Sequence, residues 1–210
     1  EKVQQVIREA RETGYQSVNT DLIYGLPLQT MKSMEETIMQ TIALRPDRIA
    51  FYSYAHVPWT SRAQRLFDEH DLPSADLKMQ LYRLSKKMFM EAGYQDIGKD
   101  QFALPKEDLY RAKQEGTLHR NFMGYTLHPT DILVGLGVSA ISDAGMGYVQ
   151  NNKPLHNYAV AIQHVRLAEK KGIFLNDEDR SLRKCILDCS VKGKTHVRND
   201  DVPLLHAFSI

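Results

Sequence analysis

The chain has 210 residues, 42% of them apolar and 25% charged, which is the composition of a globular protein with room for one sizeable core. A formal net charge of +1 gives no indication of nucleic acid as a partner, and no apolar stretch is long enough for membrane insertion. Two cysteines indicate a reducing compartment without a disulfide framework, so we expect a cytoplasmic location. The first residues carry no signal peptide and resemble the interior of a longer chain, so we expect a fragment.

Helical and extended patterns alternate along the first half of the chain. In chain order, they predict a helix that Gly14 ends, a strand at 17–24, a helix that Pro46 ends, a strand at 49–55, a looser helix at 61–69, a helix between Ser74 and Gly93, and a strand at 94–97. Ser33 and Glu36 could form a capping box for the second helix. The alternation predicts an α/β fold with parallel strands and crossover helices.

The first predicted strand carries an acid, Asp21, near the head of the run NTDLIYGLP. One interpretation is that this acid caps a chain end and hydrogen-bonds to the backbone, and the other is that it faces a ligand. Ligands of parallel sheets bind at the carboxyl ends of the strands, and Asp21, Ala55 and the stretch 98–103 all lie in or just beyond a predicted strand. If the sheet curls as a barrel, these residues share one rim, and this favours the interpretation that Asp21 faces a ligand.

After Pro105 the pattern changes. A short polar helix in KEDLYRAKQEG precedes LHRNFMGYT, which has no clear period, and the glycine-rich DILVGLGVSAISDAGMGY. This last segment lacks the third glycine of a dinucleotide fingerprint, and its glycines more simply let the backbone approach another backbone or a flat ligand. Helices are expected at 155–171 and, after a cap at Asn176, at 177–189. A boundary near residue 150 gives the domains 1–150 and 151–210.

Few residues have the spacing of a metal or ligand site. Cys185 and Cys189 form a CxxxC pair, but an iron–sulfur cluster needs at least three thiolates, so we interpret them as half-buried thiols one helical turn apart. The eight histidines form no cluster suited to zinc. In HRNFMGY, either Phe122 and Tyr125 are core residues and Arg120 pairs with an acid, or the segment is a platform for a planar anionic ligand.

Five segments with close spacing follow one another along the chain: NTDLIYGLPLQT, RPDRIAFYSYAHVP, GYQDIGKDQFALP, EGTLHRNFMGYT and LVGLGVSAIS. Together they resemble the oxygen-independent coproporphyrinogen III oxidases, a family of radical S-adenosylmethionine enzymes of haem synthesis. The resemblance covers roughly residues 1–180. It implies the C-terminal half of a partial (β/α)6 TIM-like barrel and its extension in 1–150, followed by the start of a mainly helical domain.

The resemblance also implies the cofactors. The family binds S-adenosylmethionine and a [4Fe–4S] cluster, and the CxxxCxxC motif that holds the cluster is absent from this sequence. The positions that match the family's S-adenosylmethionine contacts are Asp21, the backbone of Ala55 and the apolar Ile141. A carboxylate suits the ribose hydroxyls, the ammonium group and the sulfonium group of this cofactor.

The activity that the resemblance implies is the oxidative decarboxylation of two propionates of coproporphyrinogen III to vinyl groups, which gives protoporphyrinogen IX. It also requires an electron donor and an electron acceptor, which the sequence does not identify. The propionates need cationic partners, of which Arg120 is the first candidate, and Tyr125 of the same segment is expected to bind the substrate with it. Lys99 is the second, although a solvated surface role is the simpler interpretation. GKDQFA departs from the family's GMDHFA, and an amide at Gln101 cannot titrate as a histidine does.

Two rival functions stay open at this point. A related haem-binding chaperone shares the barrel without oxidase activity, and a radical enzyme could act on another tetrapyrrole. The segments IGKDQFA and HRNFMGYT resemble the oxidase rather than the chaperone. Because the motif that binds the cluster is absent, the resemblance implies that this chain alone is inactive.

Overall fold

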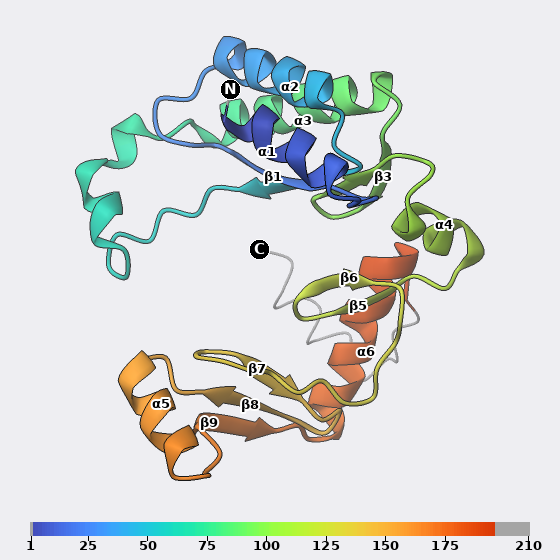
Figure 1. Cartoon of the computed structure of the whole chain (residues 1–210). Coiled ribbons are helices and arrows are strands. Elements are labelled where there is room, and N and C mark those ends of the chain that lie inside the picture. Colours follow the sequence, from blue (N-terminus) through green and yellow to red (C-terminus); the bar gives the residue numbers. More distant parts are fainter. Residues whose placement is uncertain (1, 196–210) are drawn as a thin grey trace. The chain divides into compact units, whose positions relative to one another are not determined.

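The computed structural model describes residues 2–195 and divides into two compact units, Glu1–Thr117 and Leu118–Ile210 (Figure 1). This division lies upstream of the domain boundary predicted near residue 150, which falls inside a strand of the second unit. The compact units therefore differ from the predicted domains. Among the helices of residues 2–195, none is both long and apolar enough to cross a membrane.

The first unit follows the predicted alternation of helices and strands. Its elements are α1 (Lys2–Glu12), β1 (Asn19–Tyr24), α2 (Met31–Leu44), β2 (Arg48–Ser53), η1 (Arg62–Leu66), η2 (Glu69–Asp71), α3 (Ala75–Glu91), β3 (Gln95–Gly98), β4 (Gln101–Ala103) and α4 (Asp108–Glu115). The predicted strands and long helices are confirmed within a few residues of their ends. The looser helix predicted at 61–69 is wrong in type, because this stretch contains the short 3₁₀ helices η1 and η2.

The strands of the first unit form one open sheet in the order β1-β2-β4-β3. β1 and β2 are parallel, as predicted, whereas β4 is antiparallel to both of its neighbours, so β3 runs in the same direction as β1 and β2. The stretch 98–103 does not simply follow the end of a strand, because it contains the turn of a hairpin and the strand β4. Gly98 and Lys99 have φ angles of 141° and 47°, which reverse the chain between β3 and β4.

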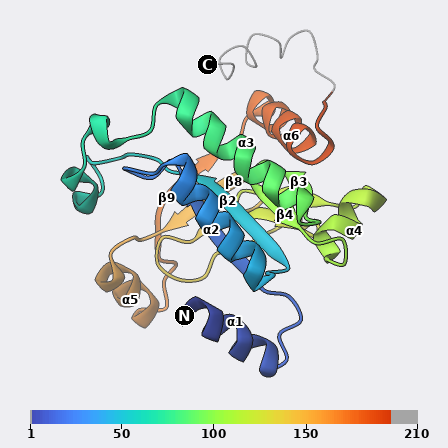
Figure 2. The same ribbon diagram turned by 90° about the horizontal axis from the view of Figure 1, so that it is seen from above.

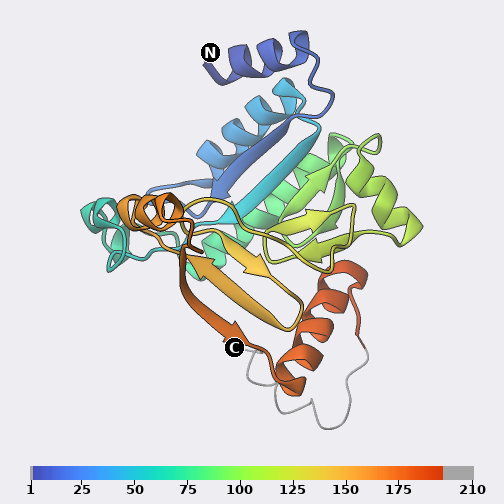
Figure 3. The same cartoon turned by 60° about the horizontal axis from the view of Figure 1, so that its bottom comes forward.

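Helices α2 and α3 cover one face of this sheet (Figure 2). The buried core between the helices and the sheet contains Met34, Ile38, Ile49, Phe51, Leu81, Phe89, Tyr94, Phe102 and Leu104. Leu22 and Tyr24 of β1 pack against this core, so the alternate residues Asn19, Asp21 and Ile23 point to the opposite face. Figure 3 turns the bottom of the unit forward, so that β1 and β2 are seen in front of α2.

The capping box of α2 lies three residues earlier than predicted. Thr30 is the N-cap, and its hydroxyl accepts a hydrogen bond of 3.1 Å from the backbone N–H of Ser33. The Ser33 hydroxyl in turn accepts the backbone N–H of Thr30 at 3.0 Å. The predicted pairing of Ser33 with Glu36 is therefore wrong, because Ser33 is the third helical residue and not the cap. Pro46 follows the left-handed C-cap Arg45, as expected for the residue that ends the helix.

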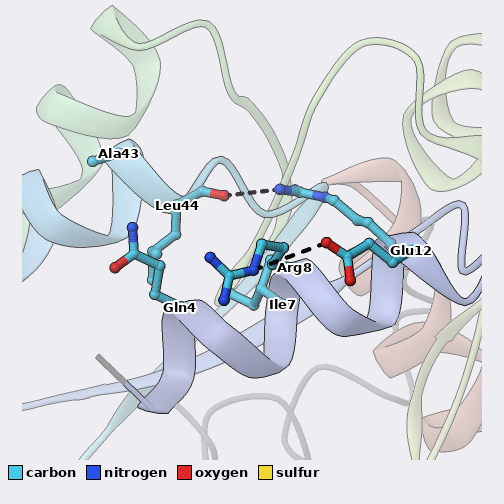
Figure 4. A pocket seen from close by; sticks show the side chains of 7 residues that line it. Gln4, Ile7, Arg8, Glu12, Ala43 and Leu44 are labelled. Atoms are coloured by element: carbon cyan, nitrogen blue, oxygen red, sulfur yellow. Dashed lines mark hydrogen bonds and ion pairs between the residues drawn. The ribbon is translucent and has the colours of Figure 1, made fainter.

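Helix α1 contacts the rest of the first unit at the C-terminal end of α2 (Figure 4). The Arg11 guanidinium donates to the carbonyl oxygens of Leu44 at 3.3 Å and Arg45 at 2.5 Å, which the end of a helix leaves without intrahelical partners. A cavity of about 450 Å³ adjoins this contact and is lined by Gln4, Ile7, Arg8, Arg11, Glu12, Ala43 and Leu44. Both arginines that line the cavity already have partners, because Arg11 donates to the end of α2 and Arg8 pairs with Glu12. We therefore assign the cavity no ligand.

Up to residue 195, the second unit contains a hairpin, a three-stranded antiparallel sheet and two helices. Its elements are β5 (His119–Asn121), β6 (Gly124–Thr126), β7 (Ile141–Asp143), β8 (Gly147–Asn151), α5 (Leu155–Gln163), β9 (Glu169–Phe174) and α6 (Asp177–Lys192). The helix predicted at 155–171 is wrong beyond Gln163, because Val165 has a left-handed φ of 54° and the chain returns as β9 to pair with β8. The helix predicted at 177–189 is confirmed as α6, with Asn176 as its N-cap.

Two glycines of the second unit allow backbone segments to touch, as the sequence predicted. A Cβ atom at Gly135 would lie 2.7 Å from the carbonyl oxygen of Ile141, and one at Gly147 would lie 2.7 Å from that of Ile173. Contacts this short exclude any side chain at either position. These glycines therefore permit the close packing of β8 against β9, and of the segment before β7 against β7 itself.

Candidate functional site

Residues from all four strands of the first unit lie in one row across the sheet. Asp21 of β1 pairs with Ala50 of β2, Ala50 pairs with Gln101 of β4, and Gln101 pairs with Gly98 of β3. Paired residues project from the same face of a sheet, and here it is the face opposite to α2 and α3. The row therefore presents a carboxylate and an amide on the face that these two helices do not cover.

The Asp21 carboxylate is exposed and accepts a hydrogen bond of 2.7 Å from the side-chain amide of Asn19, two residues earlier on the same face. Asp21 lies inside β1, not at a chain end, and within residues 2–195 its carboxylate has no backbone N–H partner. The capping interpretation therefore does not describe this side chain. Its Oδ1 atom accepts the hydrogen bond from Asn19, Oδ2 has no hydrogen-bond partner among residues 2–195, and contact with a ligand stays a prediction.

Ala55 lies two residues beyond the end of β2, in a segment without regular secondary structure. Its carbonyl oxygen accepts a hydrogen bond of 3.3 Å from the side-chain amide of Gln64. The preceding Tyr54 donates its backbone N–H to the carbonyl oxygen of the last residue of β1 at 2.8 Å, which keeps the two strand ends together. Asp21 is level with Ala50, three residues before the end of β2, and therefore lies about 10 Å below that strand end at about 3.3 Å per residue, whereas Ala55 lies beyond it.

The β3–β4 turn carries the residues in which this chain departs from the GMDHFA pattern. Lys99 is exposed, which agrees with a solvated surface role, and Gln101 is half-buried beside the row of Asp21. The backbone carbonyl of Asp100 accepts the N–H of Phe51 at 2.7 Å and holds the turn against β2. Burial, together with the charge of Asp100, raises the pKa of Tyr24. Binding of substrate by Lys99 stays a prediction.

In the second unit, Arg120 and Tyr125 face each other across the β5–β6 hairpin. The Arg120 guanidinium lies 4.8 Å from the centre of the Tyr125 ring, a cation–π distance, and has no acidic partner among the described residues. The Tyr125 hydroxyl donates to the carbonyl oxygen of Ser190 at 2.7 Å. Phe122 is 39% exposed and meets the Tyr148 ring edge-on. The hairpin therefore has neither the ion pair of Arg120 nor the buried Phe122 that the core interpretation required.

Ile141 is the first residue of β7, and its half-buried side chain lines a cavity of about 350 Å³ on the three-stranded sheet. The other residues of this cavity are Tyr148, Gln150, Lys171, Gly172 and Ile173. Ile141 belongs to the second unit, whereas Asp21 and Ala55 belong to the first. The convergence of these three residues on one ligand therefore stays a prediction.

The two cysteines of α6 differ in their exposure to solvent. Cys185 is buried and Cys189 is exposed, so the two thiols differ in environment and are not both half-buried as predicted. Within residues 2–195, no group of three or more His, Cys, Asp and Glu side chains could hold a metal ion. A [4Fe–4S] cluster therefore does not fit the residues of this chain that the structure describes.

Sequence reasoning missed some polar residues near the predicted site. Asn19, which holds Asp21, could have been found from the alternation of NTDLIY, because residues two apart share a face of a strand. Gln64 and Lys78, which contact the segment after β2, carry no comparable signal. They come from η1 and α3, and only the tertiary structure brings them to that segment.

Comparison with known proteins identifies relatives over most of the chain. No protein-family profile matches it. It is 42% identical over 186 residues to the oxygen-independent coproporphyrinogen III oxidase of Pseudomonas aeruginosa, a match to 89% of this chain and 40% of that protein. It is 44% identical over 174 residues to the protein of the same name from Salmonella typhimurium, a match to 83% of this chain and 38% of that protein.

A solved structure gives the same result for the fold. The structure of coproporphyrinogen III oxidase from Escherichia coli, described as a radical SAM enzyme, matches 90% of this chain and 44% of its own with a TM-score of 0.84 and 40% identity. The chain therefore has the α/β fold of part of a radical S-adenosylmethionine enzyme, without a closed barrel in residues 2–195. It spans about 40% of the length of the curated relatives it matches. Within this class it is related to the oxygen-independent coproporphyrinogen III oxidases, and the predicted resemblance is confirmed.

Proposed function

We propose that this chain forms part of an oxygen-independent coproporphyrinogen III oxidase. The reaction converts two propionates of coproporphyrinogen III to vinyl groups by oxidative decarboxylation and gives protoporphyrinogen IX. The observation that carries the proposal is the 42% identity over 186 residues to the Pseudomonas aeruginosa oxidase. We expect the protein to act in the cytoplasm, with an electron donor and an electron acceptor as further partners.

The open face of the first sheet suits S-adenosylmethionine. Asp21 offers one carboxylate oxygen that Asn19 fixes and a second that a ribose hydroxyl or an ammonium group could occupy. Ala55 offers backbone groups beyond the end of β2, and the resemblance to the family adds Ile141 as an apolar contact. When bound, S-adenosylmethionine and a reduced [4Fe–4S] cluster supply a 5'-deoxyadenosyl radical. The role of Asp21, Ala55 and Ile141 is to bind and orient the cofactor.

The cluster itself requires ligands from elsewhere. Cys185 and Cys189 are two thiols on one helix, and the described residues supply no third ligand. We therefore assign the cluster ligands to residues outside this sequence and expect the chain alone to be inactive.

The β5–β6 hairpin suits the carboxylates of the substrate. Arg120 stacks on Tyr125 by one face of its guanidinium, and the N–H groups at the edge of this plane are suited to a propionate. The Tyr125 hydroxyl is hydrogen-bonded to the carbonyl oxygen of Ser190, which limits the mobility of the Tyr125 ring and of the guanidinium next to it. We propose Arg120 and Tyr125 as substrate-binding residues, with Lys99 as a more exposed second cation.

Anaerobic turnover of the full-length protein tests this function. With coproporphyrinogen III, S-adenosylmethionine and a low-potential reductant, formation of the divinyl product, followed by chromatography after oxidation to the porphyrin, is the expected result. Tight haem binding without turnover would instead identify the related haem-binding chaperone. Arg120→Met is expected to raise the KM for coproporphyrinogen III about ten-fold, since a charge-assisted contact is lost. Arg83→Met, on the exposed surface of α3, is the matched control and should leave KM unchanged.

A further inference from the structure

The segment after β2 is irregular, yet side chains from outside it satisfy its backbone. Lys78 donates its Nζ to the carbonyl oxygen of Tyr54 at 2.8 Å. Gln64 bonds the segment twice, because its Nε2 donates to the carbonyl oxygen of Ala55 at 3.3 Å and its Oε1 accepts the backbone N–H of Val57 at 2.5 Å. These contacts span the YAH sequence from one side to the other.

Lys78 also joins this segment to the end of β1. Gly25, the first residue after β1, is buried with a φ of 79°, and a Cβ atom placed there would lie 2.7 Å from the Cε of Lys78. The absence of a side chain at Gly25 therefore lets the lysine chain lie across it to reach Tyr54. The Gly25 and Leu26 N–H groups donate to the side-chain oxygen of Gln29, which holds the other strand end in the same manner.

Ala55 is exposed and Tyr54 and Val57 are half-buried, so water has access to part of this backbone and is an alternative partner for its polar groups. Immobilising a lysine and a glutamine costs side-chain conformational entropy. What the fixed side chains supply is a single backbone shape for Tyr54, Ala55 and Val57. Ligand sites gain affinity from such preorganisation, because the binding energy need not order the segment.

We propose that Gln64 and Lys78 are positioning residues for S-adenosylmethionine, which hold the Ala55 backbone in its binding shape without touching the cofactor. This inference rests on the proposed function. The inference adds Gln64 of η1 and Lys78 of α3 to the proposed site. The residues matched to the family by sequence lie only in strands or just beyond their ends. Gln64 acts through its bonds to Ala55 and Val57, and Lys78 acts through Tyr54.

The test measures S-adenosylmethionine binding and steady-state kinetics in the full-length protein with its cluster reconstituted. Gln64→Glu keeps an acceptor for the Val57 N–H but cannot donate to the Ala55 carbonyl. Gln40→Glu makes the same change on the exposed surface of α2 and is the matched control. Lys78→Met keeps the aliphatic contact over Gly25 and removes the donor, and Lys78→Arg restores a cationic donor.

We expect the dissociation constant of S-adenosylmethionine to rise about ten-fold in Gln64→Glu and Lys78→Met, with the KM for coproporphyrinogen III unchanged and with partial recovery in Lys78→Arg. Wild-type affinity in both variants would overturn the inference. So would an equal rise of both constants, which a general loss of structure produces. If Gln64→Glu does not fold, the lysine pair of variants decides the matter. Failure of the wild-type protein to bind S-adenosylmethionine would instead refute the proposed function, and the inference with it.

Discussion

Replacement of Gly25 by Ala should damage the first unit by two separable routes. The residue has a φ of 79°, and its new Cβ would lie 2.7 Å from the Cε of Lys78. The first effect is backbone strain, roughly 1–2 kcal/mol for a residue with a side chain in the left-handed region. The second effect is displacement of the Lys78 side chain. Because this side chain is flexible, it moves away from the new Cβ and loses its hydrogen bond to the Tyr54 carbonyl.

The second effect can be given a magnitude. A hydrogen bond from a charged donor contributes about 1.5–3 kcal/mol, and partial exposure of Lys78 places this one at the low end, about 1–2 kcal/mol. Gly93→Ala is the matched control, because Gly93 has a φ of 90° and a Cβ there would meet nothing within 4 Å. Gly25→Ala should therefore cost about 1–2 kcal/mol more than Gly93→Ala, or roughly 2–8 °C in Tm.

Thermal and urea unfolding followed by circular dichroism measure these differences. In a Lys78→Ala background, Gly25→Ala should cost only the strain, because the displaced chain is gone, and the two substitutions should be less than additive. Equal losses at Gly25 and Gly93 in the wild-type background would refute this reasoning. A full cost of Gly25→Ala in the Lys78→Ala background would also refute it.

Three further predictions concern residues away from Gly25 and Lys78. Asp47 is buried, which by itself raises the pKa of its carboxyl, but the hydrogen bonds from Lys106 (2.6 Å) and the Val18 N–H (2.9 Å) and the nearby charges outweigh this and lower it. The bonds of Asp47 thus stabilise the protein at pH values above the ordinary Asp pKa, and this stabilisation is lost as the pH falls through the lower pKa of the folded state. Asp47→Asn should therefore cost about 2–3 kcal/mol of unfolding free energy near pH 7 and flatten the acid limb of the stability–pH curve. An unchanged acid limb would contradict this prediction. Glu36→Gln should change the free energy of unfolding by less than about 0.5 kcal/mol, because Glu36 is exposed and outside the capping box, and a loss near 1 kcal/mol in urea titration would restore the earlier assignment. Cys189→Ser should leave the iron content of the reconstituted full-length protein unchanged, and a loss of iron would show that this thiol is a cluster ligand.

Local patterns predicted most of the elements of the first unit because each has a strong signal. The apolar stripe of α3, the run Leu22–Tyr24 and the glycine or proline after each helix are readable without tertiary contacts. The order of the strands was not readable in the same way. The turn at Gly98 and Lys99 inserts β4 between β2 and β3, and only the pairing of β4 with these two strands in the structure shows it.

The second unit was less predictable for a physical reason. EKKGIF carries two lysines and a glycine and has no apolar alternation, and it becomes β9 because β8 offers it a pairing edge. Tertiary context overrides local propensity in such strands. The site shows the same division, since Asp21 stands out in an apolar strand, whereas Gln64 and Lys78 are ordinary surface residues in the sequence until the fold brings them to Tyr54 and Ala55.

The central claim is that the open face of the first sheet binds S-adenosylmethionine through Asp21, and one affinity measurement tests it most directly. Equilibrium binding of S-adenosylmethionine to the reconstituted full-length protein is compared between wild type, Asp21→Asn and the exposed-surface control Glu35→Gln. The amide keeps the size of the side chain and its bond to Asn19 but removes the charge. We predict that the dissociation constant rises about 10–100-fold in Asp21→Asn and does not change in Glu35→Gln. An unchanged dissociation constant in a folded Asp21→Asn protein would contradict the account.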